Sequence, residues 1–454
     1  MINTLYLPEL REMLAEGDHD GLREFCDALH AARTAEFMEG LTASEAWKVL
    51  QATDSQTRVD IFRYLDEDLQ EEILETSDPQ QVSELVAQMP PDDRVDLLKQ
   101  VDPQVVDSVL PLMPVEERRD ILRLTAYPEE TAGSVMTTEV ARLAESLNVQ
   151  EALEELALQT GDLETIYYVY LVDNENHLRG IVSARQLVTH LGRPETPLSD
   201  LMERDLVTVF ATDDQEAVAE KVADYNFIAI PVVDVEQHLV GIITHDDIID
   251  VLREEATEDA HLAGAVDPLE ESYLDTHWWI LTLHRVGWLG VLFAAALMTA
   301  LVLQSHHEKL NQVPWLALFL VLVISTGGNT GSQSATLIIR SLTTKEISPS
   351  DWLTVVWREL WIGSLLGLTL GTAGYLAALY FVGLDHPMDA MVIPITVLLV
   401  VICGSLVGSL LPLLFKRLGW DPALMSTPFV AGIIDIVGII VYMNVARLLL
   451  KELW

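Results

Sequence analysis

The chain has 454 residues, half of them hydrophobic, and carries 70 acidic against 27 basic residues for a formal net charge of −43. Its mean hydropathy is nevertheless positive, at +0.26. Residues 276–454 hold 9 acidic and 9 basic residues, so the first 275 residues carry the whole excess charge. This distribution excludes a nucleic-acid binder that relies on phosphate contacts, and the abundance of Leu, Ile and Val in the acidic part argues against disorder. The sequence therefore predicts a folded acidic part joined to a neutral membrane part.

The two cysteines and the start of the chain bear on the compartment. Cys26 and Cys403 are too few and too far apart to form a disulfide framework or a paired-cysteine metal site. The first 16 residues mix acids with leucines at helical spacing and lack the basic start and apolar run of a secretory signal. We therefore expect the acidic part to be cytoplasmic.

Residues 1–130 have the pattern of short helices. Turn signals containing proline recur every 11 to 14 residues, and the segments between them are apolar at helical positions. These signals are Asp78-Pro79, Met89-Pro90, Asp102-Pro103, Met113-Pro114 and Tyr127-Pro128. Because a helix of about eight residues cannot bury its apolar face alone, stacked helices are the expected solution. The sequence predicts an all-α superhelical N-domain over residues 1–130.

Residues 131–253 contain two copies of a pattern in which short strands alternate with helices. The first copy is expected to open with a strand at 134–137, and the second contains the blocks I-P-V-V-D (230–234) and L-V-G-I-I-T (239–244). With these blocks the segment resembles a tandem pair of cystathionine-β-synthase (CBS) regulatory domains of α/β structure. In that family a Thr or Ser followed three residues later by Asp often holds the ribose of an adenine nucleotide.

Thr244 and Asp247 match this nucleotide pattern in the second copy, so the resemblance implies ATP as a regulatory ligand there. The first copy has Ser183 followed by Gln186 and lacks the acid. The alternative for Thr244 and Asp247 is a helix N-cap followed by an acid in the first turn, which needs no ligand.

Five apolar runs in the last 180 or so residues are long enough to cross a bilayer, which takes about 20 residues per helix. They cover residues 286–304, 313–340, 352–382, 391–415 and 426–450. Arg340, Lys345 and Lys416 lie in loops on one side. By the positive-inside rule these loops and the N-terminal domains are cytoplasmic and the C-terminus lies outside. We expect a multi-pass protein of the cell (inner) membrane with a five-helix transmembrane bundle.

Asp435 is the most informative residue of the membrane part, because it lies deep in the fifth apolar run. A charge at that depth costs roughly 2.5–3.5 kcal/mol on insertion scales and by default indicates a functional site. The alternative is an ion pair with a basic residue of another helix, but none of the five runs carries Lys or Arg at mid-span. The charge is therefore expected to meet a cation or water.

A polar, glycine-rich stretch at residues 325–336 interrupts the second apolar run. It lacks the Gly-Lys-Ser/Thr of a phosphate-binding loop. Its glycines favour close helix packing and its oxygen-bearing side chains favour contact with a hydrated cation, and we expect both roles. Gly363, Gly367 and Gly371, and likewise Gly404 and Gly408, have the spacing of helix contacts.

The order of domains and motifs resembles the MgtE family of magnesium channels over essentially the whole chain. The motifs are G-G-N-T-G-S-Q-S-A-T (327–336), G-x-D-P-A (419–423) and P-F-x-A-x-x-x-D (428–435). The resemblance implies a homodimer with a central pore, in which Asp435 and its copy hold hydrated Mg²⁺ and Ala431 adds a carbonyl. Thr427 stands where the resemblance leads us to expect Asn. It also implies a connecting helix over residues 254–280 and a pore domain over 281–454.

The same resemblance implies regulatory Mg²⁺ sites between the N-domain, the CBS domains and the connecting helix. The matching acids are Asp92, Asp96, Asp214, Glu216, Asp247, Asp250, Glu255, Glu258, Asp259 and Asp421. By Coulomb's law these carboxylates repel one another when Mg²⁺ is scarce, which opens the pore, and Mg²⁺ bridges them when it is abundant, which closes it.

The expected function is therefore Mg²⁺ influx gated by intracellular Mg²⁺, with Mg²⁺, a second copy of the chain and the lipid bilayer as partners, and no nucleic acid. One alternative is a nucleotide-sensing, CBS-regulated transporter of another divalent cation or solute, although Asp435 disfavours an anion. A membrane-tethered enzyme is a third, but the acidic part shows no nucleophile–base pair or His/Cys metal cluster. We therefore expect no enzymatic activity.

Overall fold

The computed structural model divides the chain into two compact units, residues 1–252 and 253–454, which are described separately. The residues described are 5–159, 163–269, 273–274, 276–382 and 387–450.

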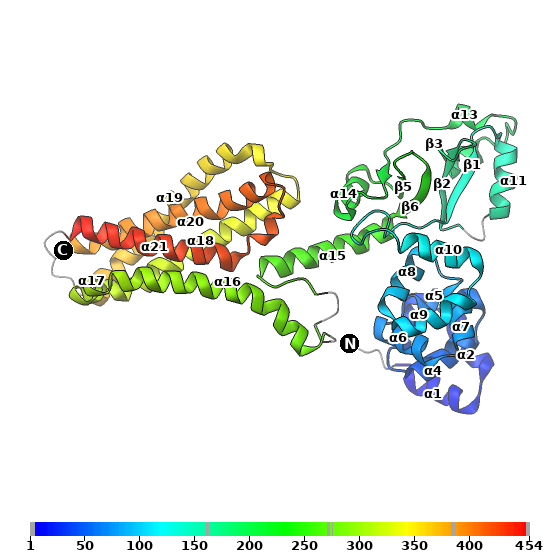
Figure 1. Cartoon of the computed structure of the whole chain (residues 1–454), viewed down its shortest axis with the longest axis horizontal. Helices are drawn as coiled ribbons and strands as arrows, with labels where there is room; N and C mark the ends of the chain where they lie inside the picture. The colour runs from blue at the N-terminus through cyan, green and yellow to red at the C-terminus, as the bar shows by residue number, and fades with distance from the viewer. Residues whose placement is uncertain (1–4, 160–162, 270–272, 275, 383–386, 451–454) are drawn as a thin grey trace. The chain divides into compact units, whose positions relative to one another are not determined.

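The first unit begins with ten short α-helices and one 3₁₀ turn that wind into a helical domain (Figure 1). They are α1 (Leu7–Glu16), α2 (His19–Ala28), α3 (Ala31–Met38), α4 (Ala43–Gln51), α5 (Ser55–Phe62), α6 (Glu67–Thr76), α7 (Pro79–Val86), α8 (Pro91–Gln100), α9 (Pro103–Val109), η1 (Leu110–Leu112) and α10 (Val115–Leu124). The Asp-Pro pairs start helices as predicted, since Asp78 and Asp102 each accept a backbone hydrogen bond at the helix N-terminus.

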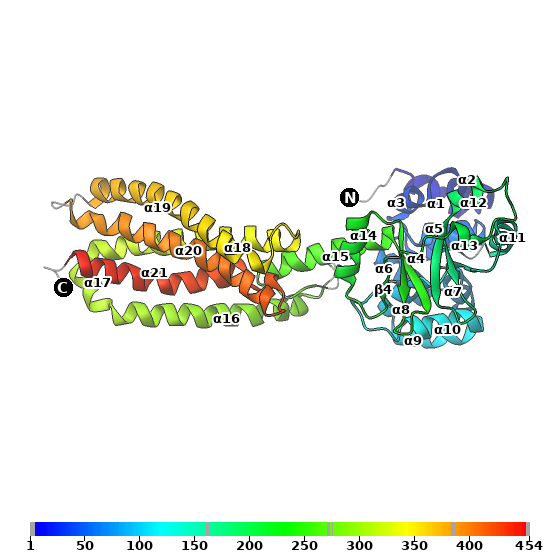
Figure 2. The same cartoon turned by 90° about the horizontal axis from the view of Figure 1, so that it is seen from above.

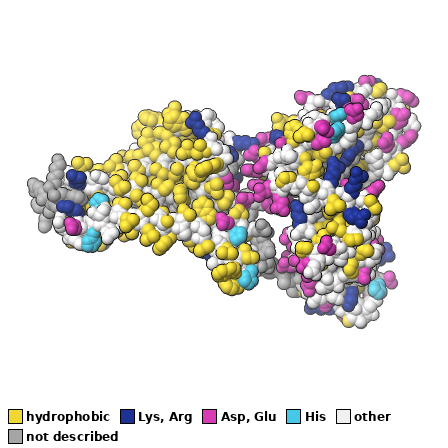
Figure 3. All heavy atoms as spheres, in the orientation of Figure 1, with side chains coloured by type: hydrophobic (Ala, Val, Ile, Leu, Met, Phe, Trp, Pro, Cys, Tyr) yellow, Lys and Arg dark blue, Asp and Glu magenta, His cyan; other side chains and the backbone are white. Residues whose placement is uncertain are grey.

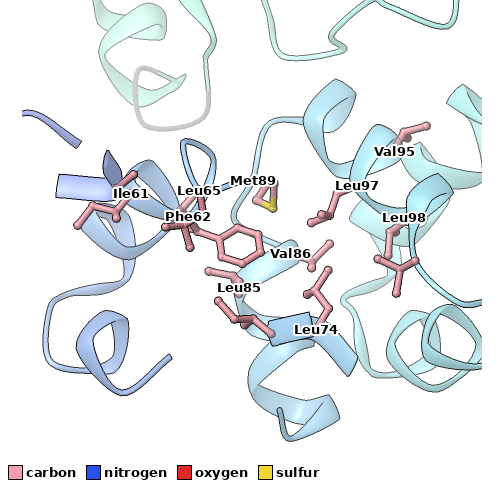
Figure 4. Close-up of a cluster of buried hydrophobic side chains, with 14 of the residues drawn as sticks. Ile61, Phe62, Leu65, Leu74, Leu85, Val86, Met89, Val95, Leu97 and Leu98 are labelled. Carbon is pink, nitrogen blue, oxygen red and sulfur yellow. The ribbon is translucent and has the colours of Figure 1, made fainter. Parts of the chain in front are cut away.

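Burial between neighbouring helices stabilises this domain, because helices of 7–10 residues are marginal alone. In Figure 4, Phe62, Val86 and Leu97 from α5, α7 and α8 lie in one cluster of apolar side chains. The cluster continues into the second CBS copy through residues such as Val232 and Ile243. The N-domain and the second CBS copy therefore share one hydrophobic core.

Each CBS copy has a three-stranded sheet in which the first pair of strands is parallel and the second antiparallel. The first copy holds β1 (Val140–Ala144), α11 (Val149–Gln159), β2 (Thr165–Val172), β3 (Leu178–Ser183), α12 (Ala184–Thr189) and α13 (Leu198–Leu201). The second holds β4 (Val209–Phe210), α14 (Gln215–Tyr225), β5 (Ala229–Val233), β6 (Leu239–Thr244) and the start of α15 (His245–Ala263).

The strand expected at residues 134–137 is not formed, and the first strand of this copy is β1 instead. Thr137 pairs instead with the sheet of the second copy, where it exchanges two backbone hydrogen bonds with Ile242 of β6, at 2.9 and 3.0 Å. The sequence pattern shows Val135 and Met136 between two hydroxyl residues, but not which sheet this segment joins.

The second unit contains five helices long and apolar enough to cross a membrane (Figure 2). They are α16 (Trp278–Ser305), α18 (Pro314–Thr343), α19 (Trp352–Val382), α20 (Val392–Arg417) and α21 (Thr427–Leu449), joined by α17 (His307–Gln312), η2 (Pro349–Asp351), η3 (Asp389–Met391) and η4 (Pro422–Leu424). Hydrophobic side chains cover most of the visible surface of this bundle, whereas charged side chains are frequent on the first unit (Figure 3). These features confirm the predicted multi-domain membrane protein.

Glycines let the helices of the bundle touch backbone to backbone. A Cβ atom on Gly404 or Gly408 of α20 would lie 2.6 or 2.1 Å from a carbonyl oxygen of Gly327 or Gly331 on α18. On α19, a Cβ on Gly367 would lie 2.8 Å from the Leu398 Cα of α20. The prediction that these glycines make helix contacts is confirmed.

The connecting helix ends earlier than the predicted residue 280. Helix α15 already begins at His245, inside the second CBS copy, and ends at Ala263. Ala265 has a positive φ of 60°, and beyond it the Asp267 amide donates to the His284 carbonyl of α16. Within the described residues, the predicted connecting segment 254–280 therefore comprises the second half of α15, residues 264–269, of which Asp267 bonds to α16, and the start of α16.

Candidate functional site

A cluster of carboxylates lies where α8, the start of α15 and the segment before β2 approach one another in the first unit. Asp92 and Asp93 occupy the first turn of α8, Asp246 and Asp247 the first turn of α15, and Glu164 precedes β2. Proline at the start of α8 and the strand-to-helix turn after β6 place the four aspartates at helix N-termini, where negative charge is favoured.

Asp92 is the most buried acid of this cluster, with 7% of its surface exposed. Its Oδ1 has no hydrogen-bond partner among the described residues. Burial, together with the charge of Asp247, raises the pKa of Asp92 well above its usual value. Burial likewise raises the pKa of Asp247 to about 7, and the charges of Asp246 and Glu164 add to the shift. The buried Asp92 and the half-buried Asp247 thus carry like charges that raise their pKa values, although the charges of Arg63 and Arg94 also act on Asp92.

Arg63 is a basic group at the edge of this cluster, where it forms an ion pair with Asp93. The charge of Arg63 also lowers the pKa of Glu164, although burial, the larger effect, leaves that pKa raised. Because the guanidinium is engaged by Asp93, the pair Asp92–Asp247 retains an excess of negative charge. A divalent cation with oxygen ligands fits this arrangement.

Sequence reasoning missed three members of this cluster. Asp93 and Asp246 adjoin predicted acids, and the doubled acids Asp92-Asp93 and Asp246-Asp247 were a usable signal. Glu164 lies in no motif, and only the folded chain brings it near the other acids.

Other predicted acids of the first unit have separate surroundings. Asp96 forms an ion pair with Lys99 at 3.4 Å, and burial raises the pKa of Asp96. Asp214 caps α14, its Oδ1 accepting from the amides of Glu216 and Ala217 at 2.9 and 3.2 Å. Asp250 lies exposed on α15. Their roles as metal ligands stay predictions.

Thr244 and Asp247 form the hydrogen bonds of a helix cap. The Thr244 amide and hydroxyl donate to Asp247 Oδ2 at 3.2 and 2.6 Å. Ser183 and Gln186 form the equivalent capping box in the first copy. The capping interpretation therefore describes this geometry, and the nucleotide role stays a prediction.

In the second unit, the structure brings two predicted acids together at the end of the connecting helix. Burial raises the pKa of Asp259, the charge of Asp421 adds to this shift, and the charges of Arg340 and Lys416 oppose it. Asp421 also caps η4 by accepting from the Ala423 amide at 2.8 Å. Glu255 and Glu258 lie half-buried on the same helix, α15.

Asp435 lies half-buried on α21, one turn after Ala431. Gly328 of α18 faces both residues, since a Cβ atom there would lie 3.5 Å from Ala431 Cβ and from Asp435 Oδ1. Within the described ranges, Asp435 forms no ion pair. The glycines of residues 325–336 therefore have two roles. Gly327 and Gly331 pack against α20, and Gly328 lies beside Asp435 without a side chain of its own.

Polar side chains lie along the face of α18 that contains Gly328. Ser325, Asn329, Ser332 and Thr336 are spaced at one helical face, and all are at least partly exposed in the single chain. The Ser332 hydroxyl donates to the Thr427 carbonyl at 3.1 Å, at the start of α21. The polar stripe thus borders the helix that carries Asp435.

Thr427 joins this region to the connecting helix, because its hydroxyl donates to the Ala263 carbonyl at 3.3 Å. Ala263 is the last residue of α15. The end of the connecting helix therefore contacts the first turn of the helix that carries Asp435.

Sequence reasoning missed Glu359, a second acid within the bundle. It is 8% exposed on α19 and accepts a hydrogen bond from the Ser334 hydroxyl of α18 at 2.9 Å. In the sequence it directly follows Arg358 near the start of an apolar run and belongs to no motif. Only the packing of α19 on α18 shows that Glu359 points inward.

Comparison with known families covers most of the chain. Residues 320–445 match the family MgtE, described as a divalent cation transporter, residues 29–130 the MgtE intracellular N domain, and residues 132–193 and 198–254 CBS domains. The magnesium transporter MgtE of Thermus thermophilus is 43% identical over 328 residues, or 72% of either chain. The chain belongs to the MgtE family. The curated MgtE relatives carry the name of transporters, a function that is not enzymatic.

Further relatives support this membership. The MgtE proteins of Enterococcus faecalis and Bacillus subtilis are 35% and 30% identical over 72% and 73% of this chain, and 71% and 72% of their own. A crystal structure of the soluble part of a magnesium transporter is 35% identical, with a TM-score of 0.52 over 55% of this chain and 97% of that one. The cytosolic domain of the Mg²⁺ channel MgtE in complex with ATP is 34% identical, with a TM-score of 0.50 over 53% of this chain and 98% of that one.

Asp92→Asn tests whether the carboxylate cluster is under repulsion. Because the pKa of Asp92 and of Asp247 is raised in the folded chain, folded protein binds protons more tightly than unfolded protein. Stability without divalent cations should fall as pH rises from about 4 through about 7. Above pH 7 the variant should exceed the wild type by on the order of 1 kcal/mol, measured as a higher unfolding midpoint of the first unit.

Asp107→Asn is the matched control, since it removes the same charge from an exposed position on α9. Adding Mg²⁺ should stabilise the wild type more than Asp92→Asn. Equal midpoints for wild type and Asp92→Asn at pH 8 without Mg²⁺ would contradict the repulsion.

Proposed function

We propose that this MgtE-family chain transports Mg²⁺ across the cell membrane through a pore that contains Asp435. The observation that carries the proposal is the Asp435 carboxylate in an apolar span, beside the gap that Gly328 leaves and without a described basic partner. A carboxylate in this position needs a cation or water. The names of the MgtE relatives, magnesium transporters, supply the cation.

The chemistry of the site suits a cation that keeps its water. Mg²⁺ dehydrates reluctantly and is usually held through bound waters and one or two carboxylates. The Asp435 carboxylate, the Ala431 carbonyl one turn earlier and the hydroxyls of the α18 stripe offer oxygen atoms to the waters of such an ion. Selection would then act on the size of the hydrated ion.

The exposure of polar groups in the bundle supports a homodimer. In lipid, the stripe Ser325, Asn329, Ser332 and Thr336 must face a water-filled path or another protein surface. A second copy related by a two-fold axis would place both stripes and both Asp435 residues on one path. No residue of the most apolar stretch of α16 is buried, so this helix is free to face lipid or the partner copy.

Basic residues near the helix ends support the orientation that we propose. Lys416 and Arg417 end α20 and Arg340 lies in the last turn of α18. By the positive-inside rule these ends, the N-domain and the CBS pair are cytoplasmic, and the C-terminus is outside. The inside-negative potential would then drive Mg²⁺ inward, by about 2.3 kcal/mol per charge per 100 mV.

Cytoplasmic Mg²⁺ would close the pore by bridging acids that repel one another without it. In the first unit the cation would bind Asp92 and Asp247, and in the second Asp259 and Asp421. Asp247 lies in the first turn of α15, and the last residue of α15 contacts Thr427 at the start of α21. Helix α15 is therefore a continuous element through which cation binding would act on the pore helix.

ATP is the second ligand that we propose for the CBS pair, at Thr244 and Asp247. A relative 34% identical in this region has been crystallised with ATP. Asp247 would then contact both ATP and the cation bound at Asp92. Each ligand would therefore change the affinity of the other by the same factor.

Asp435→Asn tests the pore directly, because it removes the charge and keeps the shape of the side chain. We expect Mg²⁺ influx into proteoliposomes to fall at least about tenfold, because the neutral amide loses a charged interaction with the cation worth roughly 1.5–3 kcal/mol. Asp389→Asn, which removes a carboxylate from η3, is the control and should transport normally. Influx by Asp435→Asn at the wild-type rate would exclude this pore assignment.

Equilibrium binding of ATP to the purified full chain tests the nucleotide site. Asp247→Ala should abolish binding, because the ribose hydroxyls lose their acceptor. Gln186→Ala changes the equivalent position of the first copy and should leave binding unchanged. If the wild type binds no ATP, or Asp247→Ala binds it normally, the proposed nucleotide site is wrong.

A further inference from the structure

Each CBS copy contains the sequence Asp-x-Glu-x-His in the loop between its two antiparallel strands. The first copy has Asp173, Glu175 and His177 between β2 and β3, and the second has Asp234, Glu236 and His238 between β5 and β6. Neither loop belongs to the carboxylate cluster, the nucleotide position or the pore.

The two loops face each other and hold each other in place. His177 and His238 stack with ring centroids 4.5 Å apart and planes inclined by 22°. The Leu178 amide donates to the Gln237 carbonyl and the Leu239 amide to the Asn176 carbonyl, at 3.2 and 3.1 Å. The loops are therefore rigid where their acidic and imidazole groups gather.

Backbone hydrogen bonds fix the aspartate of the second loop. Asp234 Oδ1 accepts from the amides of Glu236 and His238, both at 2.9 Å. Asp234 Oδ2 is left facing His238 Nδ1 at 2.9 Å, and Glu236 Oε2 lies 3.7 Å from the same nitrogen. Two ligands of a tetrahedral zinc ion, each about 2.0–2.2 Å from the metal, are roughly 3.3 Å apart. The two observed distances bracket this value.

The first loop has similar distances from its imidazole, but its three ligand atoms do not all lie within 4.8 Å of one another as those of Asp234, Glu236 and His238 do, and it carries its own cation. His177 Nδ1 lies 3.1 Å from Asp173 Oδ2 and 3.9 Å from Glu175 Oε2. Arg179 donates from Nε and Nη2 to the same Asp173 oxygen, at 3.0 and 2.7 Å. The second loop has Val240 at the position of Arg179, and this residue is buried. One loop is thus neutralised by a guanidinium, and the other presents the same ligands without one.

We propose that the loop between β5 and β6 binds a divalent transition-metal ion, such as Zn²⁺ or Co²⁺, through Asp234, Glu236 and His238. An imidazole together with two carboxylates suits such ions, whereas Mg²⁺ prefers oxygen ligands alone. The site remains open to solvent because the Glu236 side chain is 74% exposed. The ion would take the place that Arg179 occupies in the first loop.

Titration of the purified full chain with Co²⁺, in saturating Mg²⁺ to fill the oxygen sites, tests this proposal. The absorption bands of Co²⁺ report nitrogen ligation, and the wild type should bind one equivalent. His238→Ala and Glu236→Ala should each lose affinity by at least about tenfold. His19→Ala removes an exposed histidine from α2 and should bind like the wild type.

Arg179→Ala provides the sharper test, since it removes an exposed side chain and frees the ligands of the first loop. This variant should bind two equivalents of Co²⁺, and the double variant His238→Ala/Arg179→Ala should bind one. Absence of Co²⁺ binding to the wild type, retention by both His238→Ala and Glu236→Ala, or a single equivalent in Arg179→Ala would overturn the proposal. None of these outcomes depends on whether the chain transports Mg²⁺.

Discussion

The removal of carboxylates from water is the constraint on which the structure depends. Asp435 lies in an apolar helix, and Asp92 is buried opposite Asp247. Burying a charge without a partner is costly, and like charges raise the cost further. Among the described residues Asp435 has no ion-pair partner, and the charges of Arg63 and Arg94 leave the pKa of Asp92 raised. We propose that a divalent cation compensates the negative charge in both places.

The rest of the architecture holds these carboxylates where they are. Short helices with aspartate caps build an N-domain that shares its hydrophobic core with the second CBS copy, which fixes α8 against the start of α15. In the bundle, the contacts of Gly404 and Gly408 with α18 bring the backbones close enough to leave Gly328 beside Asp435. Helix α15 belongs to both arrangements, since acids lie in its first turn and its last residue bonds to Thr427.

Much of this could be predicted from the sequence, because the relevant signals are local. Apolar runs gave the five spans, Asp-Pro pairs gave helix starts in the N-domain, and the depth of Asp435 in its run marked it as a functional candidate. Domain order and motifs also led to the family.

What the sequence could not predict depends on contacts between distant segments. Glu164 joins Asp247 only after the N-domain and CBS copies fold together, and Glu359 points inward only because α19 packs against α18. The segment 134–137 was expected to be a strand of its own copy, but Thr137 pairs with the other sheet. The Asp-x-Glu-x-His repeat was visible in the sequence. Which copy could bind a metal ion depends on the contact of Arg179 with Asp173 and on Val240 at the matching position, and only the structure shows this contact.

We propose that one ion is both the cargo and the signal that closes the pore. The most direct test measures Mg²⁺ influx into proteoliposomes while Mg²⁺ is varied only on the side that exposes the N-domain and CBS pair. Influx should be rapid when that side is free of Mg²⁺ and should fall steeply as Mg²⁺ there rises to millimolar levels. Influx that stays constant over this range, after correction for the smaller gradient, would contradict it.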